Sequence, residues 1–259
     1  MTLTAKPAFR RIIVDLQVPV VRITLNHPPL NVIDMEMMGE LQAALEQAEA
    51  IPQITTIVLA GSERAFSAGV EIGAHAPESI RVMLGAFHGV VRAVAASRKV
   101  TVAVVQRHCL GGGAELTLVC DIVYATPDAV FGFPEIKLAC FPLVASAALS
   151  AVVGPKLAAE MILTGRALNG NEALAAGMVN GIADDPETLV SECLARLSQL
   201  SPAALSLAKK AFYAWDSIHF DKGLARAEQV YFEELMKTSD AAEGIRAHAE
   251  RRRPKWTGE

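Results

Sequence analysis

Residues 106–123, QRHCLGGGAELTLVCDIV, place three consecutive glycines directly before a glutamate and then continue as an almost wholly apolar run. Glycine has no Cβ, so a ligand or another segment can approach this backbone closely. The first amides of a helix carry free N–H groups, which can stabilise negative charge. The stretch therefore indicates either one half of an oxyanion-binding site or a tight turn followed by a close-packed helix.

The residues around these glycines exclude two nucleotide-binding motifs. A P-loop needs Gly-Lys-Ser or Gly-Lys-Thr after its glycines, and neither follows here. Gly111 and Gly113 are not followed by the third glycine of the dinucleotide fingerprint. A ligand held close to the glycine backbone remains as the functional interpretation.

Two glutamates lie in apolar surroundings near the glycines. Glu115 falls in the first turn of an expected helix, where the macrodipole alone would favour a surface acid. The apolar segment 114–120 instead favours a buried carboxyl group with a raised pKa, as acid–base chemistry near neutrality requires. Glu135 also has apolar neighbours in the sequence. The alternative is an ordinary acid at a strand end, because Lys137 lies nearby.

Strand and helix patterns alternate outward from this stretch. Segments 11–17 and 20–26 predict a hairpin around Val18-Pro19, and Asp34 is a plausible cap for a helix that Pro52 stops. That helix would bury one face: Met37, Met38, Leu41, Ala44, Leu45 and Ala48. Further strands are expected at 55–61, 100–106, 121–125 and 129–133, and further helices at about 78–96, 114–119 and 145–153.

The alternation continues to about residue 183, and only helical periodicity follows Pro186. Repeated strand-helix units require right-handed crossovers and a mainly parallel sheet, so the sequence predicts an α/β fold with an all-helical end. The pattern does not distinguish a flat sheet from a closed or spiral one.

Composition limits the classes of function. Of the 259 residues, 52% are hydrophobic and 20% are charged, which is typical of a soluble globular protein. A formal net charge of -4 gives no general attraction for nucleic acid or anionic lipid, so a small-molecule ligand is expected. The longest apolar segment, 138–154, is interrupted by Pro142 and indicates a buried helix, not a membrane span.

Cysteine and histidine spacing add two expectations. The four cysteines form no Cys-x-x-Cys pair and suit buried free thiols in a reducing compartment. No signal peptide is evident, so a cytoplasmic location is expected. None of the six histidines pairs at a metal-ligand spacing, and no metal site is predicted.

Three motifs, RAFSAGVEI (64–72), CLGGGAELTLVCDIVYA (109–125) and FGFPEIKLACFP (131–142), resemble the enoyl-CoA hydratase/isomerase (crotonase) family in order and spacing. Segments 25–34, 163–182 and 201–211 also resemble the family pattern, so the resemblance covers most of the chain. It implies a crotonase-like spiral of ββα units over residues 1–200, and a C-terminal helical region over 201–259 that covers CoA and takes part in oligomerisation. A homotrimer or homohexamer and an acyl-CoA thioester substrate are implied as well.

The resemblance also implies roles for individual residues. The backbone N–H groups of Val70 and Gly112 would form the oxyanion hole, and Glu115 and Glu135 occupy both positions where hydratases of the family keep glutamates. One glutamate, Glu115, would deprotonate the attacking water, while Glu135 would protonate the α-carbon, with no metal or redox cofactor. The residues expected to bind substrate are Arg64, Ala65, Ala68, Gly111, Leu143 and, through CoA phosphates across a subunit boundary, Lys255.

One segment departs from the family pattern. Simple hydratases usually have a glycine-rich segment after the second glutamate motif, whereas this chain has FPLVASAALSAVVG at 141–154. Leu143, Val144 and Leu149 are therefore expected to make the acyl pocket more apolar. Two stretches together, PPLNVID (28–34) and PEIKLACFPLVAS (134–146), resemble the cyclohexa-1,5-diene-1-carbonyl-CoA hydratases. The alternative is that segment 141–154 is a packing variant of an ordinary hydratase.

Three other functions stay open. The chain could be an enoyl-CoA isomerase or another acyl-CoA enzyme of the family, or a non-catalytic member, although the two glutamates favour water chemistry. The fold also includes an RNA-binding relative with lysine-rich first helices. Here the first helix, 34–50, holds acids and no Lys or Arg, which argues against nucleic acid as a partner.

Overall fold

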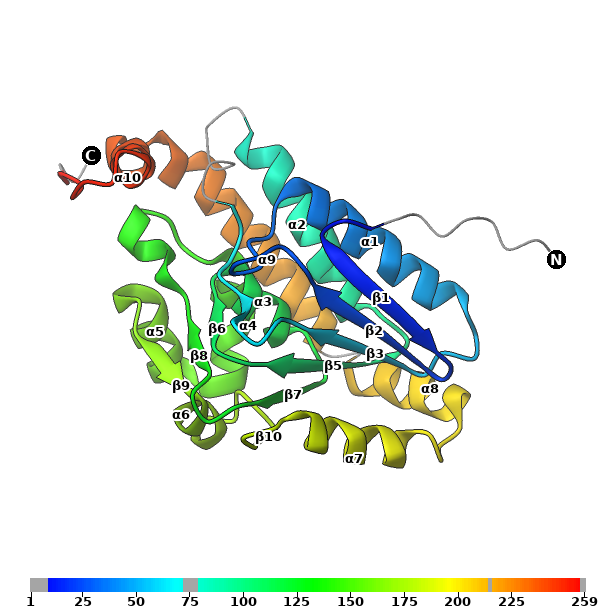
Figure 1. Cartoon of the computed structure of the whole chain (residues 1–259). Helices are drawn as coiled ribbons and strands as arrows, with labels where there is room; N and C mark the ends of the chain where they lie inside the picture. Colours follow the sequence, from blue (N-terminus) through cyan, green and yellow to red (C-terminus); the bar gives the residue numbers. More distant parts are fainter. Residues whose placement is uncertain (1–8, 72–78, 214–215, 257–259) are drawn as a thin grey trace.

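The computed structural model describes residues 9–71, 79–213 and 216–256, which fold around two β-sheets (Figure 1). Within the described residues the larger sheet has six strands, in the order β1-β2-β3-β5-β7-β10, and the smaller sheet has four, in the order β4-β6-β8-β9. The larger sheet consists of β1 (Ile12–Gln17), β2 (Val20–Leu25), β3 (Thr56–Ala60), β5 (Val100–Val105), β7 (Ile122–Ala125) and β10 (Gly181–Ile182). The smaller sheet consists of β4 (Ala65–Ser67), β6 (His108–Leu110), β8 (Val130–Gly132) and β9 (Ala167–Asn169).

From β3 to β8, consecutive strands alternate between the two sheets. The strands β3, β5 and β7 are parallel neighbours in the larger sheet, and the strands that follow each of them, β4, β6 and β8, are parallel neighbours in the smaller sheet. Helices α2 (Ile80–Ala95) and α3 (Gly112–Leu118) come next after β4 and β6, so the chain repeats a ββα unit. The predicted α/β spiral of ββα units is confirmed.

The first hairpin and helix form where the sequence predicts them. Strands β1 and β2 pair antiparallel, with Ile12 opposite Leu25. In α1 (Met35–Ala50), the side chain of Asp34 caps the helix by accepting a hydrogen bond from the Met37 N–H at 2.8 Å. All six apolar residues expected on its inner face are buried: Met37, Met38, Leu41, Ala44, Leu45 and Ala48.

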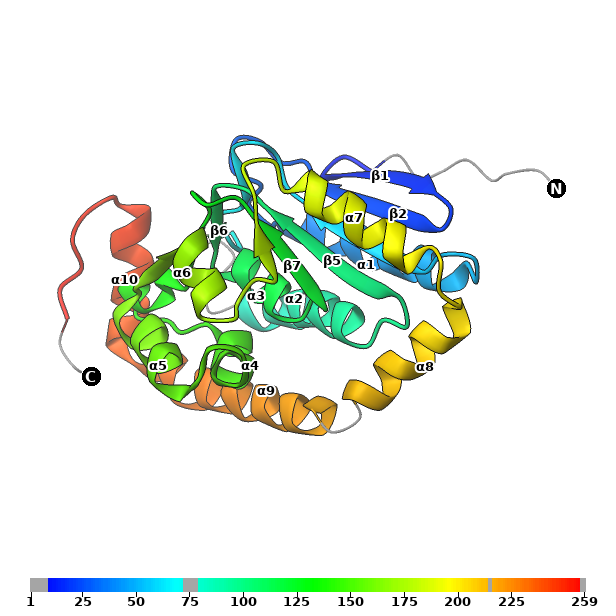
Figure 2. The ribbon, with the colours of Figure 1, turned by 90° about the horizontal axis from the view of Figure 1, so that it is seen from below.

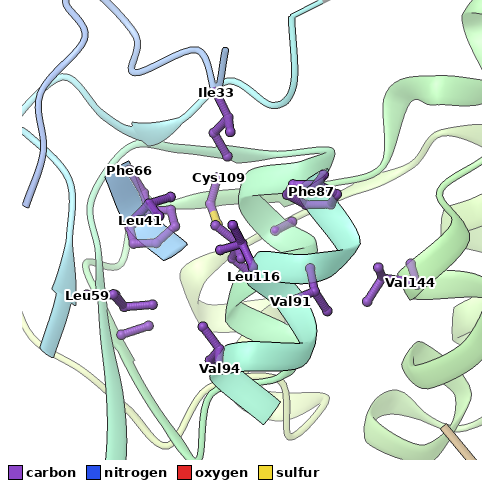
Figure 3. Packing of buried hydrophobic residues seen from close by; sticks show 14 of the residues in the cluster. Ile33, Leu41, Leu59, Phe66, Phe87, Val91, Val94, Cys109, Leu116 and Val144 are labelled. Carbon is purple, nitrogen blue, oxygen red and sulfur yellow. The ribbon is translucent and has the colours of Figure 1, made fainter. Parts of the chain in front are cut away.

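Helices α1, α2 and α3 enclose the main core with the larger sheet. Figure 3 shows Leu41 of α1, Phe87 and Val91 of α2, and Leu116 of α3 among the side chains that meet there. The expected helix at about 78–96 is α2, which begins at Ile80, and its expected first residue lies outside the described residues.

In the described residues only helices follow β10, as predicted for the chain after Pro186. The helices after β8 are η2 (Pro134–Leu138), α4 (Leu143–Val153), α5 (Pro155–Thr164), α6 (Gly170–Ala175), α7 (Glu187–Leu197), α8 (Pro202–Tyr213), α9 (Asp216–Glu233), η3 (Leu235–Lys237) and α10 (Ser239–Ala249). In Figure 2, α8 and α9 form an arc along one edge of the molecule that leads toward α10. Helix α9 packs on α4, and α10 packs on η2. Among the described helices, none combines the length and apolarity that a membrane crossing requires.

Local structure differs from expectation at four points: an extra strand, the starts of two helices and the element that carries Glu135. A second short strand, β6, separates the glycines from β5, and α3 begins at Gly112, two residues earlier than predicted. Helix α4 likewise begins at Leu143. Glu135 lies in the first turn of a 3₁₀ helix, not at a strand end. Three-residue strands and single 3₁₀ turns are too short to show a hydrophobic period, which explains why the sequence pattern does not reveal them.

Candidate active site

The three glycines bring the start of α3 into close contact with its neighbours. Gly111 has φ +49°, a left-handed conformation that favours glycine, and a Cβ there would lie 2.7 Å from Oε1 of Glu135. A Cβ on Gly113 would lie 2.7 Å from Cβ of Ser67, in β4. Side chains at either position would therefore push Glu135 or β4 away from the helix start.

Gly112 contacts the segment that follows β4. A Cβ on Gly112 would lie 2.6 Å from Cγ2 of Val70 and 3.0 Å from Cζ of Phe87. A Cβ on Gly69 would in turn lie 3.7 Å from the backbone nitrogen of Gly112. The two residues expected to supply an oxyanion hole, Val70 and Gly112, are therefore in contact.

Both residues offer a backbone N–H group. Ile33 bonds to the residues on either side of Val70: its N–H donates to the Gly69 carbonyl at 2.9 Å, and its carbonyl accepts from the Glu71 N–H at 3.0 Å. Gly112 is the first residue of α3, where an N–H has no intrahelical acceptor. In the described part of the chain, no acceptor is paired with the N–H of Val70 or Gly112.

Glu115 is held by the start of α4. Its Oε1 accepts hydrogen bonds from the backbone N–H groups of Val144 at 2.8 Å and Ala145 at 3.0 Å, and the residue is 5% exposed. Burial raises the pKa of Glu115 to about 7, although the two backbone hydrogen bonds act in the opposite direction. The carboxyl group thus has a fixed orientation and titrates near neutrality.

Glu135 lacks such support. Its Oε2 is buried and has no hydrogen-bond partner among the described residues. Burial, together with the nearby charge of Glu115, raises the pKa of Glu135 to about 8. The two glutamates therefore interact, and their proton equilibria belong to the pair.

A cavity of about 90 Å³ lies between these segments, which is room for several water molecules. Its lining within the described residues carries polar side chains at only four positions: Glu115, Glu135, Cys140 and Tyr231. The apolar side chains and prolines that complete it are Ala68, Val70, Met83, Leu84, Phe87, Pro134, Leu138, Phe141, Pro142, Leu143 and Ile245. Among the described residues no group of three or more His, Cys, Asp and Glu side chains could hold a metal ion.

The structure brings together most of the predicted site residues. Ala68, Val70, Gly111, Gly112, Glu115, Glu135 and Leu143 all line the cavity. Arg64 is exposed and Ala65 is fully buried in β4, and neither lines it. Lys255 is exposed in the tail and lines a separate hollow with Arg246 and Arg252.

Two of the three apolar residues expected in the pocket wall lie elsewhere. Leu143 faces the cavity, but Val144 and Leu149 are fully buried in the core. Nearly every position of α4 is apolar, so its sequence has no polar face that would show which side turns toward the cavity. The sequence analysis does not predict the lining residues that come from α2, α9 and α10, because they belong to no recognisable motif. Examples are Phe87, Tyr231 and Ile245.

Comparison with known proteins gives a consistent result. A family model described as enoyl-CoA hydratase/isomerase matches residues 15–259. A cyclohexa-1,5-dienecarbonyl-CoA hydratase of Thauera aromatica is 31% identical over 236 residues, covering 91% of this chain and 92% of the relative. A probable enoyl-CoA hydratase of Rhizobium meliloti is 35% identical over 255 residues, covering 96% and 98%. The crystal structure of an enoyl-CoA hydratase from Mycobacterium avium subsp. paratuberculosis superposes with a TM-score of 0.86 at 31% identity, covering 96% of this chain and 99% of that chain.

Proposed function

Because this chain belongs to the enoyl-CoA hydratase/isomerase family and is a hydratase-type lyase, we propose that it adds water to the double bond of an enoyl-CoA or alicyclic dienoyl-CoA thioester. The observation that carries the proposal is a pair of glutamates, buried Glu115 and half-buried Glu135, which line one largely apolar cavity beside two backbone N–H groups that have no acceptor among the described residues. This arrangement suits a reaction that moves two protons and develops negative charge on one oxygen.

The thioester oxygen is proposed to bind between the N–H groups of Val70 and Gly112. When water attacks the β-carbon, the electrons of the double bond move toward the carbonyl and an enolate forms. Fixed donors stabilise this enolate more than the neutral thioester, and such differential binding lowers the barrier.

The two carboxyl groups are proposed to divide the proton transfers. Ionised Glu115 accepts a proton from the water molecule as its oxygen bonds to the β-carbon. Protonated Glu135 then donates its proton to the α-carbon, and the enolate returns to a thioester. One proton enters the pair and one leaves it, so the proposed steps balance without a metal or redox cofactor.

The pH dependence of kcat/KM should be bell-shaped, with its maximum between about pH 7 and pH 8. Below this range Glu115 is protonated and cannot accept a proton from water. Above it Glu135 is ionised and cannot donate. Rates of crotonyl-CoA hydration measured across this range check the expectation, and a rate that keeps rising well above pH 8 would remove Glu135 as the acid.

The acyl group is proposed to be an alicyclic diene. The Thauera aromatica relative is named for hydration of a cyclohexadiene thioester, and the cavity lining includes the apolar residues Phe141, Pro142 and Leu143. A flat ring would make more contact with this apolar lining than a short straight acyl chain would.

We expect kcat/KM for cyclohexa-1,5-diene-1-carbonyl-CoA to exceed that for crotonyl-CoA by roughly 10-fold or more, since a difference of a few methylene groups in an apolar pocket has an effect of this size. Parallel initial-rate measurements on both thioesters test this. A clear preference for crotonyl-CoA would reject the alicyclic substrate while leaving the hydratase assignment intact.

Two further parts of the proposal concern how CoA is bound and how subunits associate. Exposed Arg64 and Lys255 are suited to pair with CoA phosphates. Helix α8 has no buried residue and exposes Leu207 and Phe212, at 65% and 72%, which suits burial in a homotrimer or homohexamer.

A further inference from the structure

Helix α10, the last helix of the described residues, supplies one side chain to the cavity. Ile245 is half-buried and lines the cavity together with Leu138, Phe141 and Tyr231. The cavity has a volume of about 90 Å³, well below the roughly 300–1,000 Å³ of pockets that hold larger ligands. The position of this one apolar side chain therefore bears directly on which acyl groups fit.

Three consecutive residues set how α10 is turned about its axis. Successive residues of an α-helix point about 100° apart, and Glu243, Gly244 and Ile245 have three different partners. The buried Glu243 carboxylate accepts hydrogen bonds from the Arg252 guanidinium at 2.5 and 2.9 Å and from the Lys255 backbone N–H at 2.9 Å. With Glu243 bound to the tail and Gly244 packed on η2, Ile245 is turned into the cavity.

Gly244 sets the distance between α10 and the turn that carries Glu135. A Cβ on Gly244 would lie 2.2 Å from the backbone oxygen of Leu138 and 3.3 Å from Cβ of Ala139, so the close approach requires glycine. Leu138 ends η2, the 3₁₀ helix whose first turn holds Glu135. Because such a helix rises about 2 Å per residue, the contact lies roughly 6 Å along η2 from Glu135. Packing on the same short helix thus fixes Ile245 relative to the carboxyl group.

We infer that Ile245 is a specificity-determining residue: its side chain ends the acyl site and limits the length of acyl group that fits while the thioester oxygen stays on the N–H groups of Val70 and Gly112. Compact groups, such as a six-membered ring or a four-carbon chain, fit in front of Ile245. A straight chain of eight carbons that extends along η2 collides with it. The inference rests on the proposed function, since it concerns the acyl group of the same site.

The test compares trans-2-enoyl-CoA thioesters of eight and four carbons by the ratio of their kcat/KM values for hydration. Ile245→Ala shortens the side chain and should raise this ratio about 10-fold or more, since even one methylene group in an apolar pocket has an effect of this size. Ile245→Phe enlarges the side chain and should lower the ratio. Leu163→Ala, which truncates a side chain of α5 that is 68% exposed, is the matched control and should leave the ratio unchanged.

A second pair of variants tests the contact between α10 and η2. Gly244→Ala places a Cβ against the backbone of Leu138, so α10 must move away from η2 and the ratio should rise as it does in Ile245→Ala. Gly39→Ala, in α1, is the control, because a Cβ there would have no atom within 4 Å. Its ratio should equal that of the wild type.

Three results would overturn the inference. An unchanged ratio in both Ile245 variants would show that this side chain does not limit the acyl group. A KM raised by the same factor for both thioesters would place Ile245 against the CoA part that they share. An unchanged ratio in Gly244→Ala would show that the contact with η2 does not set the length limit. Failure of the proposed function is a different result: the wild type would then form no hydroxyacyl product from either thioester or from the cyclic dienoyl-CoA.

Discussion

Replacing either Glu115 or Glu135 by glutamine is expected to lower kcat for enoyl-CoA hydration by about 10²- to 10⁴-fold, the usual contribution of a group that transfers a proton in the transition state. Glutamine has nearly the same shape but neither accepts nor donates the proton as a carboxyl group does. The affinity for the CoA ester should change little, because neither carboxyl group is proposed to hold the CoA part.

The contacts of Glu115 should survive the substitution, so a loss of rate can be assigned to proton transfer. In Glu115→Gln, the amide oxygen can still accept the N–H groups of Val144 and Ala145, so the start of α4 should stay in place. Glu46→Gln, at an exposed position of α1, is a matched control that should retain full activity. Steady-state rates and unfolding temperatures of the three variants suffice, and near-normal rates in both cavity variants would end the two-carboxyl mechanism.

The second large effect concerns the backbone N–H of Gly112. Removing one oxyanion-hole donor typically lowers kcat by about 10²- to 10³-fold. Proline at this position removes the N–H, and the first position of a helix tolerates proline. It also introduces a Cβ, which would meet Val70 Cγ2 at 2.6 Å, so Gly112→Pro alone would combine donor loss with a steric clash.

A pair of double variants separates these two effects. Val70→Ala removes the clashing Cγ2 while keeping the Val70 N–H. In that background, Gly112→Ala adds a Cβ and keeps the donor, whereas Gly112→Pro adds a Cβ and loses it. We expect the proline variant to be about 10²- to 10³-fold slower than the alanine variant at saturating crotonyl-CoA. Equal rates in the two would argue against a backbone oxyanion hole.

Long, strongly patterned elements could be predicted from the sequence, because their packing is local. The helix that follows Asp34 repeats apolar residues at the helical period and has a cap, and the structure agrees residue by residue. Strand β6 and the turn that carries Glu135 are too short for any period to appear. Their conformation depends on pairing with distant segments, such as β8 beside β6.

In the candidate site, too, some features can be predicted from local motifs and others depend on contacts between distant segments. Motif resemblance placed Glu115 and Glu135, and the structure joins them in one cavity. The N–H groups that hold Glu115 come from residues about thirty positions later in the chain, at Val144 and Ala145, and no sequence pattern encodes that contact. The sequence does not predict that Tyr231 lines the cavity, because a single aromatic residue in a helical run indicates a core position.

The most direct test of the central claim is the mass of the product formed from crotonyl-CoA in water enriched in oxygen-18. The account predicts a product heavier than the substrate by one water molecule, with the oxygen-18 label in a new hydroxyl group, and none of it with Glu115→Gln/Glu135→Gln. An unlabelled product of unchanged mass with a displaced double bond, or no product with either crotonyl-CoA or the cyclic dienoyl-CoA, would contradict it.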